Sequence, residues 1–183
     1  MQGYSILKND KVHCLMGGGQ LINVSTVSSK GVPDVMTCAW NTVYDYDQPL
    51  VVLAKEHTTT RNILDTGRYV IALPGIDALD HAYKVGSDHG CNTGDKFSFA
   101  GITPEHSLKF GIPVIPNALG YIECEILMHD LFEQTGILIG RAVSVMVKAG
   151  LFDEVQELFN PGAAKIMHYV GGECVYTDGK FHS

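Results

Sequence analysis

Paired cysteine motifs are absent from this chain, and the cysteine spacing argues against two kinds of small stabilised domain. The 183 residues include five cysteines, and no two of them form a C-x-x-C pair. They are Cys14, Cys38, Cys91, Cys124 and Cys174. An odd, widely spaced set argues against a disulfide framework, and the lack of paired ligands argues against a zinc ribbon. We therefore expect reduced thiols and no metal site, with Cys38 and Cys124 as small core residues in strands.

Long apolar runs and an excess of positive charge are also absent. No stretch approaches the roughly 18 apolar residues of a membrane span, and residues 1–10 lack the apolar segment of a signal peptide. The 13 Lys and Arg against 20 Asp and Glu give a formal net charge of −7. Because phosphate contacts dominate affinity for nucleic acids, this balance argues against a nucleic-acid partner. We expect a cytoplasmic protein that binds neither membrane nor nucleic acid.

The chain also lacks a complete dinucleotide-binding fingerprint. Glycines occupy positions 17–19, but the G-x-G-x-x-G pattern needs a glycine at position 22, where Ile22 stands. The segment 22–27 is typical of a strand instead of a helix. A turn at 29–33 and a strand at 35–41 follow, so the pattern predicts a β-hairpin.

The rest of the chain predicts many strands and a few short helices. Alternating apolar residues indicate a second long hairpin, and apolar residues at helical spacing indicate short helices between the strands. The expected elements are strands at 121–130 and 137–147, helices at 76–85 and 152–159, a helical turn starting at 103, a loop at 86–94 and an extended piece at 96–97. The predicted fold is mainly β with short helices (α+β), an antiparallel barrel-like single domain over residues 1–183.

The segment 50–74 is the most informative part of the chain. Its pattern predicts a strand, a polar turn, a helix of about two turns that ends near Gly67, and a second strand. Thr58 or Thr59 is the expected N-cap. Such a helix start binds anions, because its first N–H groups lack partners and its dipole end is positive. Phosphate binding and simple helix capping are both compatible with this segment.

Several motifs, taken in order, resemble those of the flavin reductase-like family. They are D-V-M-T-C-A-W-N at 34–41, D-x-P-L at 47–50, T-x-x-N-I-x-x-T-G at 59–67, G-D-K-F at 94–97 and E-C-E at 123–125. The resemblance covers roughly residues 15–150 and is closest to flavoredoxin-type proteins. It implies the FMN-binding split β-barrel fold and a homodimer with FMN at each subunit interface. A barrel of few strands fills its interior with side chains, so a ligand must bind at its mouth or between subunits.

The resemblance also implies which residues hold the cofactor. The phosphate would bind at Thr58, Thr59 and Thr60, with Lys55 or His57 supplying charge. The isoalloxazine would lie against Thr37, Cys38, Ala39, Trp40, Asn41 and Thr42. Further candidates are Asp34, where the family often has asparagine, Lys96, His129 and Tyr169. For several of these an ordinary role is also open: core or interface packing for Trp40, a surface ion pair with Asp95 or a neighbour for Lys96, and solvent exposure for His129.

A flavin cofactor would carry the chemistry itself, so we expect no catalytic acid, base or nucleophile. The preferred function is reduction of flavin, or of an acceptor through flavin, by NAD(P)H. The alternative is a flavoredoxin-like electron carrier that meets redox partner proteins without using NAD(P)H directly. A third class is a protein of the same fold that binds another phosphorylated ligand or haem.

Overall fold

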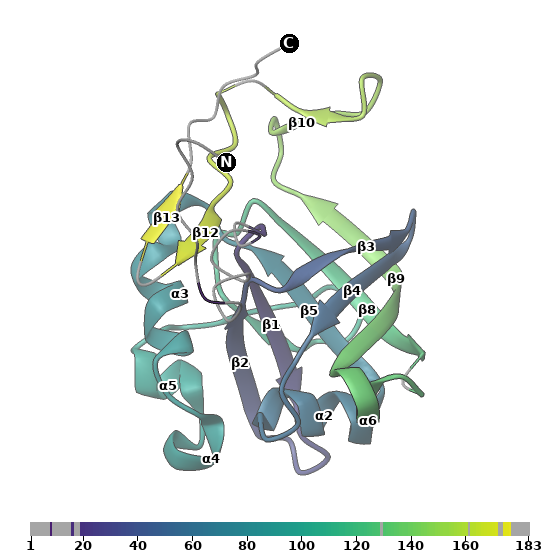
Figure 1. Cartoon of the computed structure of the whole chain (residues 1–183). Coiled ribbons are helices and arrows are strands. Elements are labelled where there is room, and N and C mark those ends of the chain that lie inside the picture. Colours follow the sequence, from purple (N-terminus) through teal and green to yellow (C-terminus); the bar gives the residue numbers. More distant parts are fainter. Residues whose placement is uncertain are drawn as a thin grey trace.

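Seven antiparallel strands form the main sheet of this protein, shown in a computed structural model that describes residues 8, 16, 19–128, 130–160, 162–171 and 174–176 (Figure 1). The strands follow the order β2-β1-β5-β8-β9-β4-β3. Their bounds are β1 (Ile22–Val27), β2 (Pro33–Cys38), β3 (Asn41–Asp45), β4 (Gln48–Val52), β5 (Arg68–Leu73), β8 (Gly120–Met128) and β9 (Ile137–Val147). Both predicted hairpins are confirmed: Ile22 pairs with Cys38, and Tyr121 pairs with Met146.

A two-residue connection forces this sheet to curl. Ala39 and Trp40 alone join β2, at one edge of the sheet, to β3, at the other edge. Three Cα–Cα steps reach at most about 11 Å, so the two edges must converge at this end. The result is an antiparallel split barrel, which confirms the predicted fold class.

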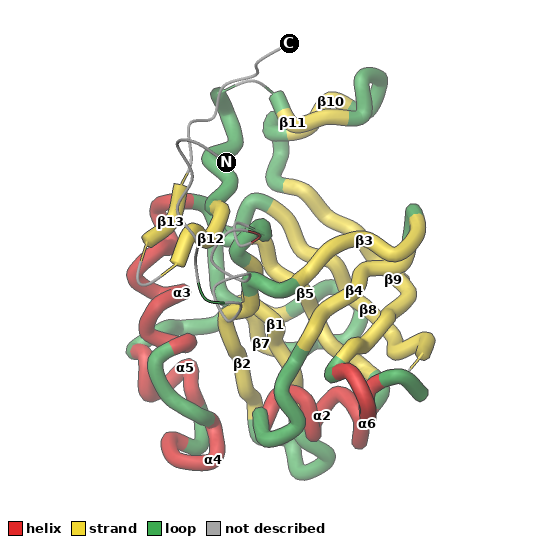
Figure 2. Tube along the Cα trace, viewed as in Figure 1, coloured by secondary structure: helices red, strands yellow, loops and turns green. Residues whose placement is uncertain are grey.

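Short helices cover one side and one end of the barrel (Figure 2). Helices α3, α4 and α5 gather beside β2, while α2 and α6 lie at the end of the barrel where β2 begins. Their bounds are α2 (Thr58–Thr66), the 3₁₀ turn η2 (Ile76–Ala78), α3 (Leu79–Gly86), α4 (Gly90–Thr93), α5 (Lys96–Ala100) and α6 (Phe132–Thr135). The short strands are β6 (Glu105–His106), β7 (Pro113–Val114), β10 (Phe152–Asp153), β11 (Leu158–Phe159), β12 (His168–Gly171) and β13 (Cys174–Tyr176).

Two apolar clusters fix the helices against the barrel. The barrel core contains the buried thiols Cys38 and Cys124, as predicted. Burial raises the pKa of Cys38 to about 11 and that of Cys124 to about 12. The second cluster joins Val35 of β2 to Val85 of α3 and Phe97 of α5. This cluster sets the distance between β2 and the helices, and hence the space between them.

Residues 86–100 contain more helix than the sequence predicts. The structure has helix α5 where the pattern at 96–97 predicts an extended piece, because the Asp95 carboxylate accepts hydrogen bonds from the N–H groups of Phe97 (2.9 Å) and Ser98 (3.4 Å). This is a side-chain N-cap. Helix α4 likewise interrupts the predicted loop at 86–94.

Two other predicted helical pieces are strands. The segment that starts at Thr103 runs into β6, which pairs with β7. The segment 152–159 is the hairpin β10–β11 instead of a helix. Its turn forms because Asp153 accepts hydrogen bonds from two backbone N–H groups that follow it, and its strands are held by an edge-to-face contact of Phe152 with Phe159. The predicted helix at 76–85 is confirmed as η2 and α3.

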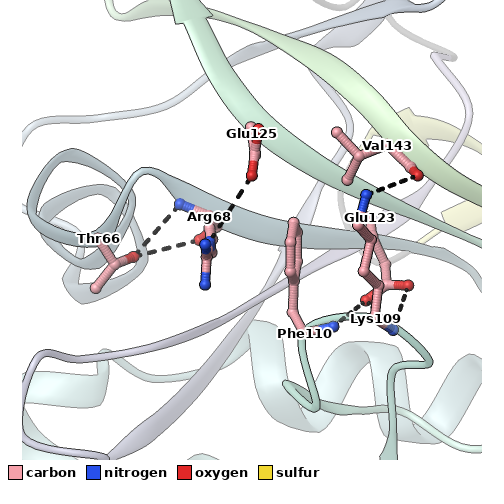
Figure 3. Close-up of polar contacts among 7 residues, drawn as sticks. All are labelled: Thr66, Arg68, Lys109, Phe110, Glu123, Glu125 and Val143. Carbon is pink, nitrogen blue, oxygen red and sulfur yellow. Dashed lines mark hydrogen bonds and ion pairs between the residues drawn. The ribbon is translucent and has the colours of Figure 1, made fainter.

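The buried carboxylate of Glu123 anchors the loop that contains Lys109 and Phe110 to the main sheet (Figure 3). Glu123 of β8 has no exposed surface and accepts hydrogen bonds from the N–H groups of Lys109 and Phe110 at 2.8–3.0 Å. Arg68 covers the Phe110 ring, with 5.0 Å from its guanidinium carbon to the ring centroid. Burial raises the pKa of Glu123, but these N–H donors and the hydroxyls of Ser107 and Ser144 outweigh it and hold the net pKa below its ordinary value.

Candidate functional site

One cavity of the candidate site lies between β2, helix α3 and strand β12. Its volume is about 530 Å³, within the range of small-molecule sites. It is lined by Leu21, Thr37, Ala39, Ala82, Tyr83, Lys84, Gly86, Ser87 and Tyr169. The Thr37 side chain is held in place in the cavity wall by two hydrogen bonds. Its hydroxyl donates to the Ala82 carbonyl of α3 and accepts from the Asn23 amide of β1 at 3.0 Å. The cavity therefore has a rigid wall of mixed apolar and polar character.

A smaller polar pocket of about 100 Å³ adjoins this cavity. Thr37 and Gly86 line both spaces. The other residues around the pocket are Asp34, Met36, His57, Thr58, Thr59, Val85, Asp88, His89, Gly90 and Lys96. The pocket has room for about three water molecules at the volume of the liquid, so it suits one compact polar group. Together the two spaces suit a ligand with a large ring system and a small charged end.

Two opposite charges are buried in the wall of the polar pocket. Asp34 is 2% exposed and Lys96 is 4% exposed. The Lys96 ammonium donates to the Val85 carbonyl at 2.8 Å. Burial lowers the pKa of Lys96, and the Asp34 charge opposes that shift. Burial raises the pKa of Asp34, and the Thr59 hydroxyl, Lys96 and His57 oppose this without cancelling it. The surface ion pair with Asp95 that the sequence left open for Lys96 is therefore wrong.

Two histidines form the mouth of the polar pocket. His57 and His89 have ring centroids 5.4 Å apart with 33° between their planes. Burial lowers the pKa of His57, and the charges of His89 and Lys96 lower it further. The Nδ1 atom of His57 is buried and has no hydrogen-bond partner within the described part of the chain. The two rings therefore lie beside each other in the lining of the polar pocket.

The three threonines of α2 have different roles. The expectation that Thr58 or Thr59 caps the helix is wrong, because His57 is the N-cap residue and makes no side-chain capping bond. The Thr59 hydroxyl donates to Asp34, and the Thr60 hydroxyl donates to the Ala54 carbonyl at 2.8 Å. Both threonines are buried, and Thr60 lines neither space. Thr58 alone keeps a half-buried hydroxyl at the pocket.

Several other predicted residues lie away from these two spaces. Lys55 makes an exposed ion pair with Glu133 at 2.7 Å. Asn41 donates its amide to the Gln20 carbonyl at 2.8 Å and, with Thr42, lines a separate cavity of about 290 Å³ on the inner side of the half-barrel. Trp40 is 58% exposed, so a core role for it is wrong. Cys38 points into the barrel core.

The remaining predicted residues divide between the large cavity and the part of the chain that is not described. Thr37, Ala39 and Tyr169 line the large cavity. His129 lies outside the described residues. The structure thus brings Asp34, Thr37, Ala39, His57, Thr58, Thr59, Lys96 and Tyr169 together around two adjoining spaces.

Sequence reasoning missed His89 and Lys84 as lining residues. The sequence presents His89 only beside Cys91, as a possible pair of metal ligands. Among the described residues no group of three His, Cys, Asp or Glu side chains could hold a metal ion. Lys84 lies in the last turn of α3, the helix that the sequence predicts at 76–85. Its position in this predicted helix was the signal that could have identified it.

Comparison with known proteins assigns this fold to a class, the split barrels. A crystal structure of an FMN-binding domain of a flavin reductases-like enzyme from Shewanella baltica OS155 has a TM-score of 0.81 at 21% identity, over 98% of this chain and 96% of that one. Flavoredoxin of Desulfovibrio vulgaris (Miyazaki F) has a TM-score of 0.79 at 22% identity, over 100% and 94% of the two chains. At this level of identity the likeness establishes the fold.

The family follows from the sequence match. Residues 19–183 match the family model described as flavin reductase like domain, so the chain belongs to the flavin reductase-like family. The Escherichia coli (strain K12) protein YddH is 28% identical over 151 residues, which are 80% of this chain and 79% of that protein. Within the described residues, no helix is long and apolar enough to cross a membrane.

Proposed function

We propose that this protein binds FMN, with the isoalloxazine ring in the 530 Å³ cavity and the phosphate in the polar pocket. The observation that carries this proposal is that Thr37 and Gly86 line both spaces, so the larger cavity and the polar pocket are neighbours. The donor set suits such a ligand, because the pocket offers the Lys96 ammonium, the Thr58 hydroxyl and the two histidines. His57 Nδ1 and Asp34 Oδ1 are buried without partners among the described residues, and a bound group would satisfy them. Membership of the flavin reductase-like family supports the same ligand.

Each part of the site has a distinct task in this proposal. Thr37, held by Ala82 and Asn23, orients the ligand at the junction of the two spaces. Tyr169 and Ala39 supply apolar surface to the ring, and Lys84 supplies the positive charge at the edge of the large cavity. FMN, when bound, supplies hydride or single-electron transfer, and the protein positions it and adjusts its electronics.

The proposed activity is NAD(P)H-dependent reduction of flavin, or of an acceptor through flavin. The second candidate is electron transfer without direct use of NAD(P)H, which the likeness to flavoredoxin favours. The first activity requires room for a nicotinamide at about 3–3.5 Å from the ring. The second requires only an exposed flavin edge and a redox partner protein.

We further propose that the working form is a homodimer in which a second copy covers the β3–β4 hairpin. Four large side chains at this hairpin are exposed: Trp40 at 58%, Val43 at 73%, Tyr44 at 59% and Tyr46 at 105%. β3 is also an edge strand, whose backbone groups are open to a partner. Aromatic side chains are enriched at the centres of protein interfaces. Analytical ultracentrifugation of the wild type and of Tyr44→Ser/Tyr46→Ser tests this, and a wild-type monomer contradicts it.

The cofactor is tested by the spectrum of the purified protein. The protein, after incubation with FMN and desalting, is expected to show flavin absorbance, and heat should release FMN. Anaerobic addition of NADH and then NADPH separates the two activities: bleaching supports the reductase, and persistent colour that dithionite removes supports the electron carrier. A protein that remains colourless with excess FMN contradicts both.

A further inference from the structure

A buried carboxylate forms part of the wall of the pocket assigned above to the phosphate. Asp34 is 2% exposed, and its Oδ2 accepts a hydrogen bond from the Thr59 hydroxyl. Its Oδ1 has no hydrogen-bond partner in the described part of the structure. Gly90 encloses this oxygen so closely that a Cβ atom at position 90 would lie 2.2 Å from it. The carboxylate is therefore packed closely against the Gly90 backbone.

The charges that face Asp34 do not favour a doubly negative ligand. Lys96 of α5 is the positive group of the pocket, and Asp88, which precedes α4, adds a second carboxylate. His57 before α2 and His89 before α4 are the other titratable groups that line the pocket. Arg61 of α2 does not line it, but its guanidinium donates to the hydroxyl of the lining residue Thr58 at 3.5 Å. With both histidines neutral, the sum of the formal charges of the lining groups is −1. A phosphate dianion would bring the total to −3 in a space of about 100 Å³.

One bound proton relieves the repulsion between the phosphate and the carboxylates of the pocket. When two acidic groups share a site, ionising both costs additional free energy, so one of them keeps its proton. A phosphate monoester loses its second proton at a pH of about 6, so holding that proton near neutral pH requires little free energy. The unsatisfied Oδ1 of Asp34 is the acceptor or donor that such a proton needs.

We propose, building on the FMN site above, that the phosphate of the flavin binds together with one proton that it shares with the Oδ1 atom of Asp34. FMN binding then takes up a proton wherever the free phosphate is a dianion. The affinity for FMN falls as the pH rises above about 6, by as much as about tenfold per pH unit. Riboflavin, which has no phosphate, binds without this dependence. Asp34 thereby makes FMN retention sensitive to pH.

The test measures the affinity of FMN and of riboflavin between about pH 6 and about pH 8. It compares the wild type, Asp34→Asn and Asp88→Asn. The wild type is expected to lose roughly ten- to a hundredfold in FMN affinity over this range. Asp34→Asn has the same shape and can still accept from Thr59, but it cannot share the proton. We expect its FMN affinity to change less than about threefold over the range and to exceed that of the wild type at the higher pH by about tenfold or more.

Asp88→Asn is the matched control. It removes one negative charge from the same pocket, but the Asp88 carboxylate already accepts hydrogen bonds from the His89 N–H and the Asn92 amide. The pKa of Asp88 is lowered by these bonds, so this carboxylate stays ionised throughout the test. Asp88→Asn is expected to shift FMN affinity equally at every pH and to keep the wild-type slope.

Proton uptake by the wild type gives a second measurement that needs no variant. Calorimetric titration in two buffers of different ionisation enthalpy is expected to show about one proton taken up per FMN near pH 8 and none per riboflavin. If the FMN affinity of Asp34→Asn falls with pH as steeply as that of the wild type, the proposal is overturned and the proton is assigned to the histidines. Equal slopes for FMN and riboflavin, or no proton uptake, also overturn it. Absence of FMN binding at every pH refutes the proposed function itself, which is a different result.

Discussion

Removal of the Lys96 ammonium is the most direct way to show that this buried cation offsets the buried charge of Asp34 in the polar pocket. Lys96→Met keeps most of the aliphatic stem and deletes the charge. The structure predicts two losses: the buried charge of Asp34 loses a cation that offsets it, and the Val85 carbonyl loses its 2.8 Å hydrogen bond. Breaking a buried pair on one side costs about 3–5 kcal/mol. We expect the free energy of unfolding of the apoprotein to fall by about this amount near pH 8.

The assay is urea unfolding of the apoprotein, followed by circular dichroism. With a slope of about 2 kcal/mol per molar urea, the expected loss lowers the midpoint by about 1.5–2.5 M. Asp34→Asn/Lys96→Met is the matched control, because it removes both charges. Replacing a buried pair by neutral groups is often nearly neutral for stability. The double variant is therefore expected to recover most of the loss, with about 1 kcal/mol left for the Val85 carbonyl.

The pH dependence of this effect has a definite direction. The pKa of Asp34 is already raised by burial, and loss of Lys96 removes a charge that opposes the shift. A carboxyl whose pKa is higher in the folded than in the unfolded state destabilises the fold as the pH rises above its unfolded pKa. The loss in the free energy of unfolding caused by Lys96→Met is thus expected to be smaller near pH 5 than near pH 8. The difference is about 1.4 kcal/mol at most for each pH unit. An unchanged urea midpoint, or a double variant no more stable than Lys96→Met, would refute the idea that Lys96 offsets the buried charge of Asp34.

Three further predictions concern other parts of the molecule. Glu123→Gln is expected to cost about 2 kcal/mol near pH 7, because it replaces charge-assisted bonds to the loop at 107–112. The pKa of Glu123 is lowered in the fold, so wild-type stability should decline as the pH falls below about 4.5. Urea unfolding of the wild type and of Glu123→Gln at two pH values measures both effects. Gly90→Ala should weaken FMN binding by about tenfold or more, because its Cβ displaces the Asp34 carboxylate, and fluorescence titration measures this. Cys91 should react with a thiol reagent in the folded protein while Cys38 and Cys124 remain protected, and simultaneous labelling of all three would contradict their burial.

The sequence by itself determined the elements whose signals are local. Alternating apolar residues specify the hairpins β1–β2 and β8–β9, because a strand buried on one face repeats every two residues. Helical spacing specifies α3, and the left-handed conformation of Gly67 (φ 72°) ends α2 where the sequence predicts. The ordered motifs of the flavin reductase-like family led to the fold, because their order along the chain reflects the order of these elements.

Local patterns failed where a single side chain decided between helix and strand. The extended piece at 96–97 is wrong because Asp95 caps a helix there, and the helix at 152–159 is wrong because Asp153 closes a hairpin turn. Both aspartates make hydrogen bonds to nearby backbone N–H groups. The same residue type starts a helix in one place and a turn in the other, according to what the following residues can pack against.

Only the tertiary structure decided which groups form the polar pocket. Asp34, Thr59 and Lys96 are far apart in the sequence, and nothing in their local spacing indicates that β2, α2 and α5 meet. Their meeting buries the Thr59 hydroxyl against Asp34 and turns an apparently exposed lysine into a buried cation. The physical reason is that burial and hydrogen-bond partnership depend on packing between distant segments, whereas periodicity records only how one segment faces the core.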